Sequence, residues 1–200
     1  MYVPKSFEMH DVNEVREFIN ANSFGILMST VNDRPLATHL PFIYDVEQNS
    51  LFAHMAKANP QWQDLHGQLA MAIFTGPHAY ISPSWYEVPD SVPTWNYMAV
   101  HVYGKCSIID DANEFAGLLN KMVRFFEPDS QLPSQVDEAF YQNMMKAIIG
   151  IRIDIQSIQG AAKLSQNKSA DIQQRVIANL RQMEDAGAQA VAQLMHDRLL

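Results

Sequence analysis

Residues 24–44 read FGILMSTVNDRPLATHLPFIY, and this stretch decides the fold. The apolar runs at 24–30 and 36–44 are each typical of a β-strand. Between them lies Asn32-Asp33-Arg34-Pro35, which is typical of a tight turn because Asn and Asp tolerate turn conformations and Pro fixes φ. Strands joined by so short a turn pair in an antiparallel manner.

Short apolar runs alternate with turns further along the chain. We expect more strands at 51–55, 69–75, 79–82 and 95–109, and a short helix at 60–67 that starts from Asn59-Pro60. Strands separated by short turns favour an antiparallel meander that closes into a barrel. The segment 82–94 contains Pro83, Pro89 and Pro93 and is predicted to be a long connecting loop, and such loops are often functional.

Helices are expected on both sides of this β-region. Asp11 and Asp111 each precede a glutamate by three residues, as in a capping box at the start of a helix. A half-buried strand is expected at 149–155, where isoleucines alternate with other residues. We expect an N-terminal helix at 11–21 and a helical C-terminal part at 111–147, including a second helix at 135–147, and at 169–198. The sequence therefore predicts a single α+β, mainly β domain over residues 1–200, an antiparallel barrel with flanking helices.

Composition excludes several classes of protein. The chain has 200 residues, of which 14 are Lys or Arg and 22 are Asp or Glu, so its net charge is −8. This balance argues against a broad DNA or RNA footprint, which needs a basic face. The lone Cys106 excludes a disulfide framework and a cysteine-rich zinc site, and no histidine pair has metal-ligand spacing, so we expect no metal. We find no apolar run long enough to span a membrane and no signal peptide, which predicts a cytoplasmic protein without membrane contact.

Residues 54–62, HMAKANPQW, are the first candidate for chemistry. They follow a predicted strand and enter a predicted helix, and such a junction exposes backbone N–H groups that favour an anion. Lys57 adds a positive charge, while His54 and Asn59 add hydrogen-bond donors. The alternative is a surface lysine beside a capped helix.

Two more polar or aromatic segments are candidates. The segments 80–86 and 93–97 gather aromatic, Ser, Thr and Asn side chains that could stack on a planar ring and bond to its edge, or could pack at a rim or a dimer interface. The segment 163–168, KLSQNK, could close a polar site after a barrel strand, or could simply cap the next helix.

At these segments the sequence resembles the PaiB family, FMN-binding proteins often labelled negative transcriptional regulators. The resemblance rests on blocks that run over nearly the whole chain, and their order and spacing together are specific. The blocks are Met1-Tyr2-Val3-Pro4, 37–42 (ATHLPF), His54 with 56–62 (AKANPQW), Gly76-Pro77, 80–86 (YISPSWY), 93–97 (PTWNY) with Val100-His101 and Gly104, and 163–167 (KLSQN). The family is similar to the FMN-binding split barrels, which include pyridoxamine-phosphate oxidases.

The resemblance implies an antiparallel, Greek-key-like split barrel that forms a homodimer with FMN at the subunit interface. By this resemblance Lys57 grips the FMN phosphate, with His54 and Asn59 beside it. The resemblance also places Thr38 and His39 along the edge of the isoalloxazine ring. It implies that the ring is covered from the partner subunit by Trp95, Asn96 and Tyr97, together with Ser82 and Trp85. It implies further that the pocket is completed by Lys163, Ser165, Gln166 and Asn167. Many members carry Arg at the position of Lys57, and Lys keeps the charge but loses the bidentate geometry.

Three functions follow from these observations. The first is an FMN-binding protein with FMN-dependent oxidoreductase activity, for which the sequence identifies neither a catalytic residue nor a small-molecule substrate. The second is negative regulation of transcription, which we expect to be indirect, because the charge and the missing recognition helix argue against a direct DNA-binding repressor. The third is a split barrel that binds haem or another tetrapyrrole through His54 or His101.

Overall fold

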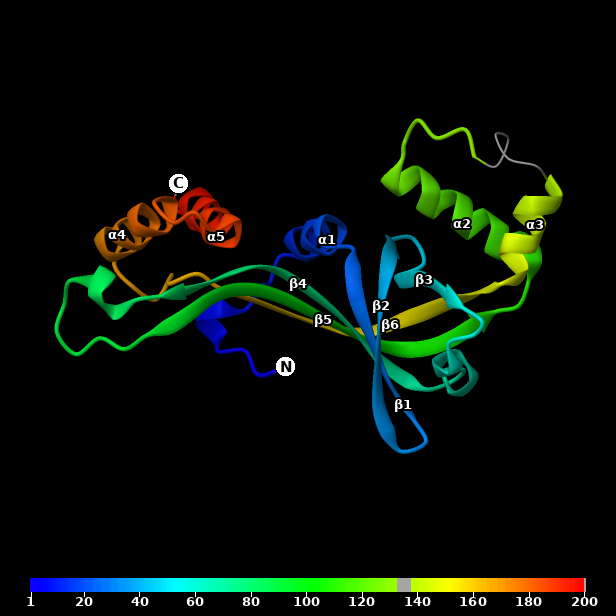
Figure 1. The fold of residues 1–200 in the computed structure, drawn as a ribbon. Helices are drawn as coiled ribbons and strands as arrows, with labels where there is room; N and C mark the ends of the chain where they lie inside the picture. The colour runs from blue at the N-terminus through cyan, green and yellow to red at the C-terminus, as the bar shows by residue number, and fades with distance from the viewer. Residues whose placement is uncertain (133–137, 200) are drawn as a thin grey trace. The chain divides into compact units, whose positions relative to one another are not determined.

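A computed structural model describes residues 1–132 and 138–199. In this part of the chain, six strands form a closed antiparallel barrel in the order β1-β2-β3-β6-β5-β4 (Figure 1). The strands are β1 (Phe24–Val31), β2 (Arg34–Asp45), β3 (Ser50–Ala56), β4 (Leu69–Ile81), β5 (Thr94–Ile109) and β6 (Ile148–Lys163). The helices are α1 (Val12–Ala21), α2 (Ala112–Phe126), α3 (Glu138–Lys146), α4 (Ala170–Arg181) and α5 (Ala186–Asp197), with short 3-10 helices η1 (Lys5–Phe7), η2 (Pro60–Asp64) and η3 (Pro83–Tyr86).

The contacts within the chain gather in two compact units. We call Ile19–Phe74 with His101–Ile158 the barrel unit, and Met1–Phe18, Thr75–Val100 and Gln159–Leu200 the helical unit. Strands β4, β5 and β6 each contribute one part to either unit. The expectation of a single domain stays a prediction.

The hairpin β1–β2 forms where the sequence predicts it. The two strands pair from Phe24 opposite Pro41 to Val31 opposite Arg34. Asn32 and Asp33 form the turn with φ of 49° and 59°, the left-handed region that these two residues tolerate. Pairing of β1 with β4 and of β3 with β6 continues the sheet around the barrel.

Because successive side chains of a strand point to opposite faces of the sheet, the barrel unit has two apolar layers. Inside the barrel, the rings of Phe42 and Phe74 meet edge to face with their centroids 5.4 Å apart. On the outer face of β3, Phe52 packs against Phe115 of α2. The buried members of this second layer are Ile43, Phe52, Ile109, Phe115, Leu118, Leu119 and Met122. The apolar stripe of α2 therefore covers one side of the sheet (Figure 1).

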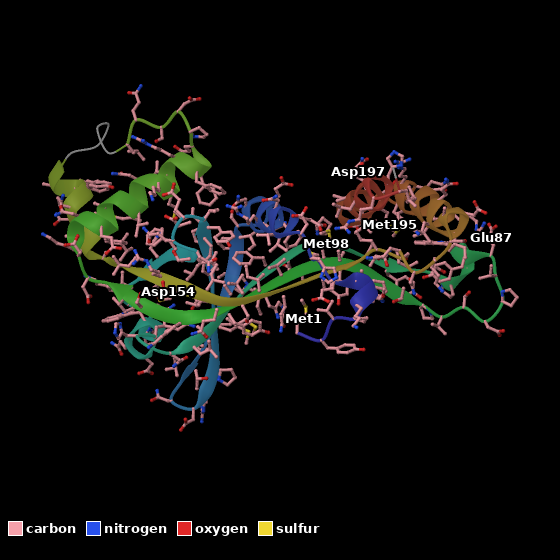
Figure 2. The ribbon with its side chains drawn as sticks, turned by 180° about the vertical axis from the view of Figure 1, so that it is seen from behind. Met1, Glu87, Met98, Asp154, Met195 and Asp197 are labelled. Atoms are coloured by element: carbon pink, nitrogen blue, oxygen red, sulfur yellow. The ribbon has the colours of Figure 1, made fainter. Side chains whose placement is uncertain are left out.

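The helical unit is built around the pair α4–α5, whose helices lie side by side (Figure 1). Val176 and Leu180 of α4, with Val191 and Met195 of α5, are buried. Figure 2 labels Met195 on α5 and Glu87 in the loop that follows η3. Helix α4 also contacts η3, where the Nη2 of Arg175 donates a hydrogen bond of 2.7 Å to the carbonyl of Tyr86. The loop after β4 is thereby tied to the C-terminal helices.

The structure corrects two strand predictions. The strands expected at 69–75 and 79–82 are one strand, β4, which continues through Gly76-Pro77. Gly76 is required by packing and not by a turn, since a Cβ there would lie 2.7 Å from the Phe18 ring. Strand β6 continues eight residues beyond 155, because Gly160 lies against Met9 and pairs with it through a hydrogen bond of 3.0 Å from Met9 N to Gly160 O.

The α-helices lie within the ranges expected from the sequence, with different bounds. Helices α1 and α2 start one residue after Asp11 and Asp111, and the Asp111 carboxylate accepts the backbone N–H of Glu114, as a cap does. The helix expected at 169–198 is two helices, α4 and α5, separated at 182–185. Of the helix expected at 135–147, positions 135–137 lie outside the described residues, and α3 accounts for Glu138–Lys146.

Candidate functional site

The turn after β3 holds Lys57 on a fixed backbone. Its N–H donates to the carbonyl of Ala147 over 2.9 Å, and its own carbonyl accepts the indole Nε1–H of Trp62, also over 2.9 Å. The Lys57 side chain is exposed, and within residues 1–132 and 138–199 it makes no ion pair. The ammonium group of Lys57 therefore has no ion-pair partner among the described residues, and the backbone that carries it is held by hydrogen bonds at both its N–H and its carbonyl.

A buried polar network supports this turn. Asn59 caps η2, with its Oδ1 accepting from Gln61 N over 3.0 Å, and its Nδ2 donates to Thr38 Oγ1 over 2.9 Å. Thr38 in turn donates to the side-chain oxygen of Gln61. The hydroxyl of Thr38 is thus already used within the protein, and Thr38 and Asn59 position the turn that carries Lys57.

Gln61 is the member of this network that sequence reasoning missed. Its side chain is fully buried, and its Nε2 donates to Ser29 Oγ over 2.8 Å and to the carbonyl of Leu36 over 3.2 Å. The residue stands within the motif 54–62, but nothing in its local sequence distinguishes a buried glutamine from an exposed one. Its partners lie on β1 and β2, which only the folded chain brings to it.

A pocket of about 510 Å³ opens beside Lys57, in the size range of cofactor sites. Lys57 and Lys146 supply two ammonium groups to its lining, while Phe115 of α2 supplies an apolar wall. Asp110 and Asp111 add carboxylates, of which Asp111 is the cap of α2. The pocket can therefore accept an anionic group near the lysines and an apolar ring near α2.

His54 lies apart from Lys57, in a second and mostly apolar pocket of about 420 Å³ between β2, β3 and α2. Its lining includes Pro41, Leu119 and Met122. Burial lowers the pKa of His54, so the ring is neutral at pH 7. Its Nδ1 is buried and has no hydrogen-bond partner among the residues that the structure describes. A buried ring nitrogen without a partner is available to a ligand.

His39 takes a different position on β2. The side chain is exposed, and its ring stacks on Phe24 of β1 with the centroids 6.2 Å apart. Phe24 is itself exposed, so the hairpin presents a flat aromatic surface to its surroundings. The predicted residues of the barrel unit thus divide into three places: the turn of Lys57, the pocket of His54 and the outer face at His39.

In the helical unit, β5 separates residues that the sequence groups together. Trp95 is 52% exposed, and its ring centroid lies 6.0 Å from those of His78 and Tyr80 on β4. Asn96 is fully buried and lines a third pocket, while Tyr97 is half-buried. Because successive residues of a strand point to opposite faces, Trp95 and Asn96 cannot line the same site within one subunit.

The segment 163–167 lies near Asn96. Asn96 Nδ2 donates to Ser165 Oγ over 3.0 Å, and Lys163 Nζ donates to the hydroxyl of Thr94. Gln166 is turned inward, since its Oε1 accepts from Leu164 N over 2.7 Å and its Nε2 donates to the carbonyl of Ala162. Asn167 is exposed and lines the same pocket as Asn96.

Ser82 has a local task at the start of η3. Its hydroxyl oxygen accepts the backbone N–H of Ser84 over 3.3 Å and contacts the Ser84 hydroxyl at 2.7 Å, as an N-cap does. Trp85, which follows in η3, is half-buried. No group of three or more metal-ligating side chains is found in residues 1–132 and 138–199.

Comparison with known proteins gives the family. Residues 1–157 match the family model described as "Putative FMN-binding domain". The chain belongs to this FMN-binding family. It is 37% identical to "Protease synthase and sporulation protein PAI 2" of Bacillus subtilis (strain 168) over 205 residues, which cover 100% of this chain and 98% of the relative. The resemblance to the PaiB family is therefore confirmed.

Solved structures agree on the fold of this FMN-binding family member. The flavocytochrome Anf3 from Azotobacter vinelandii matches with a TM-score of 0.66 at 16% identity, covering 80% of this chain and 72% of that one. The FAD and haem binding protein from Mycobacterium smegmatis matches with a TM-score of 0.64 at 14% identity, covering 83% and 78%. The prediction of a split barrel is confirmed. None of the described helices has the length and apolar character needed to cross a membrane.

The residues around Lys57 fit FMN. An unpaired ammonium on a fixed main chain suits a phosphate, since a preorganised charged donor loses little freedom on binding. The pocket beside it has room for a ring system, and its Phe115 wall is apolar. The Nδ1 of His54, which has no partner among the described residues, lies in the separate apolar pocket.

Proposed function

We propose that the protein binds FMN through the turn that follows β3, with Lys57 holding the phosphate. The observation that supports this most directly is the turn itself, in which both backbone groups of Lys57 are hydrogen-bonded while its ammonium is unpaired among the described residues. In this proposal Thr38 and Asn59 are positioning residues, because their side chains hold the turn in shape. His54 lies in its own pocket and His39 on the outer face of β2, apart from this turn, so their contacts with FMN stay predictions.

We propose further that two copies of the chain form a homodimer with FMN between them. The support is the exposed aromatic surface of the helical unit, where Trp95 stands between His78 and Tyr80 with half of its surface open. Large exposed aromatic groups favour a partner surface or a planar ligand. Trp95 and the neighbouring Tyr97, supplied by the partner subunit, would cover the isoalloxazine ring.

FMN, when bound, supplies electron transfer, which is the basis of the proposed oxidoreductase activity. The chain contributes the fixed cation, the aromatic cover and the exclusion of water from the ring. Burial of His54 and His101 lowers the pKa of both rings, so both are neutral at pH 7, and the Nδ1 of each ring has no hydrogen-bond partner among the described residues. A substrate of the reaction does not follow from these residues.

The regulatory role of the family is proposed here as an indirect one. The net charge of −8 opposes the phosphate backbone of duplex DNA, whose binding is largely electrostatic. A mobility-shift assay at about 150 mM salt is expected to give no specific complex. A defined operator that binds tightly and in a salt-dependent manner would contradict the proposal. The cytoplasmic location stays a prediction.

Fluorescence titration with FMN tests the role of Lys57. Lys57→Met removes the charge but keeps most of the apolar stem, and loss of a charged hydrogen bond of about 1.5–3 kcal/mol weakens FMN binding by about tenfold to a hundredfold. Lys57→Arg, which keeps the charge, is expected to bind at least as tightly as the natural chain. The matched control is Lys105→Met, an exposed lysine that does not line the pocket.

Two comparisons test whether Lys57 holds the FMN phosphate. Equal FMN affinity for Lys57→Met and Lys105→Met would remove Lys57 from the site. Riboflavin, which has no phosphate, provides the second arm, since the proposal requires Lys57→Met to leave riboflavin affinity unchanged. A variant that loses affinity for both ligands equally would point to a damaged fold instead of a lost phosphate contact.

Haem binding is the second candidate, and the pocket of His54 favours it. A haem iron can take a neutral imidazole as its protein ligand. His54 presents such a ring in an apolar pocket of about 420 Å³. Absorption of the purified protein separates the two cofactors, since haem has a strong band near about 400 nm and flavin has two near about 375 and 450 nm. Reconstitution of His54→Ala with haem tests the residue, because an unchanged spectrum would exclude His54 as the axial ligand.

A further inference from the structure

The helical unit contains a small polar pocket that the proposed FMN site does not use. Its volume is about 230 Å³, and it lies between the loop at 90–94, the start of β5 and the turn after β6. Its walls carry Lys163 and Lys168 from the turn after β6 and Asp90 from the loop, with Phe7 and Tyr86 as aromatic surfaces. Every one of these residues belongs to the helical unit, so the pocket is complete within one subunit.

The charges of the lining are unusual for this chain. Lys163 and Lys168 are cationic and Asp90 is anionic, which leaves one net positive charge in a protein whose overall charge is −8. Lys163 is half-buried and its Nζ is directed to the Thr94 hydroxyl at the pocket wall. Lys168 Nζ lies over the ring of Tyr86, 5.1 Å from the centroid. Both ammonium groups are thus held near the same cavity.

Two buried residues form the floor of the pocket, and the backbone of one of them is strained. Asn96 is fully buried, and its Nδ2 donates to Ser165, which is itself 4% exposed. Ser165 has φ of 62°, a conformation that costs free energy in a residue other than Gly, Asn or Asp. Such backbone strain tends to gather where a ligand is bound, and Ser165 lies in the chain between Lys163 and Lys168, which both line the cavity.

We propose that this pocket binds a small organic acid through a single carboxylate group. The volume lies below the range of about 300–1,000 Å³ for sites that hold a drug-sized molecule, so the cavity suits a small acid and not a whole flavin nucleotide. One net positive charge matches one carboxylate, and the rings of Phe7 and Tyr86 suit an aromatic or short apolar body. The inference does not depend on FMN binding, and it gives the segment 163–167 a role other than completing the flavin pocket.

Three matched probes test the chemistry. Benzoate carries the carboxylate on an aromatic body, phenyl phosphate replaces it by a phosphate, and benzyl alcohol is neutral. Binding is followed in proton–nitrogen correlation spectra through the side-chain amides of Asn96 and Asn167, which line the pocket. We expect benzoate to shift both signals in a saturable manner and benzyl alcohol to shift neither. Tighter binding of phenyl phosphate than of benzoate would overturn the assignment to a carboxylate.

Charge variants test the residues. Lys163→Met is expected to weaken benzoate binding about tenfold and Lys168→Met, at the exposed end, about threefold. Asp90→Asn is expected to tighten it about threefold, because a like charge is removed, and a purely structural role would not produce this opposite sign. Lys105→Met, an exposed lysine of the barrel unit, is the control. Equal affinities in the natural chain, Lys163→Met and Lys105→Met would overturn the proposal.

FMN gives the last arm of the experiment. FMN titration of the protein is expected to leave the affinity for benzoate unchanged. Competition between FMN and benzoate, with FMN shifting the amides of Asn96 and Asn167, would overturn the inference and assign the pocket to the flavin. Failure of FMN to bind anywhere would count against the proposed function and leave the benzoate result standing by itself.

Discussion

Replacing Gln61 by methionine breaks the buried network that supports the Lys57 turn. Methionine has nearly the same length but cannot donate, so the Leu36 carbonyl and the Ser29 hydroxyl lose the bonds of 3.2 and 2.8 Å that Gln61 supplies. Thr38 loses its acceptor as well. A buried polar group left without a partner costs about 1–3 kcal/mol. The hydroxyls can rotate towards new partners, but the Leu36 carbonyl and the Leu27 carbonyl, which accepts from Gln61 Nε2 over 3.3 Å, cannot. We therefore expect two unsatisfied groups and a loss of about 2–6 kcal/mol in the free energy of unfolding.

Urea denaturation measures this loss. With a slope of about 2 kcal/mol per M, the midpoint for Gln61→Met is expected to fall by about 1–3 M. Gln63→Met is the control, since Gln63 lies on the same short helix and is exposed. Affinity for FMN is expected to fall with stability in Gln61→Met, because the turn that presents Lys57 is no longer fixed. If Gln61→Met and Gln63→Met unfold at the same urea concentration, the network contributes nothing and the reasoning is wrong.

Four further predictions concern single residues. Gly104→Ala is expected to lose about 3 kcal/mol of stability in urea denaturation, because its Cβ would clash with the backbone carbonyl of Asp154. Gly117→Ala, in open space within α2, is expected to gain about 0.5–1 kcal/mol, and a loss there would contradict the argument. Burial holds the pKa of His54 below 6.5, so the unfolded chain takes up a proton that the folded chain does not. Stability is therefore expected to fall as the pH drops below 6.5, and His54→Gln should show a shallower fall. Burial, and secondarily the Asp154 carboxylate, raise the pKa of Cys106 to about 12, so iodoacetamide is expected to label the folded protein slowly at about pH 8 and the urea-unfolded protein rapidly.

The candidate site was only partly accessible from the sequence. The cation Lys57, the cap Asn59 and the hairpin turn at Asn32 and Asp33 follow from residue types at short spacing. The separation of Trp95 from Asn96 follows from strand periodicity, which already places neighbours on opposite faces. The burial of Gln61, in contrast, depends on packing against β1 and β2, and no pattern in the sequence near Gln61 predicts that these strands cover it.

Local order in this protein was set by the sequence itself. Caps and turns depend on atoms a few residues apart, so Asp111 before α2 and Asn32 in the hairpin act in the same way whatever surrounds them. The tertiary structure alone decided where strands continue and which polar groups are buried. Gly76 reads as a strand end but lies against Phe18 inside a continuous strand. The physical reason is that packing joins residues far apart in the chain, and their distance is known only after folding.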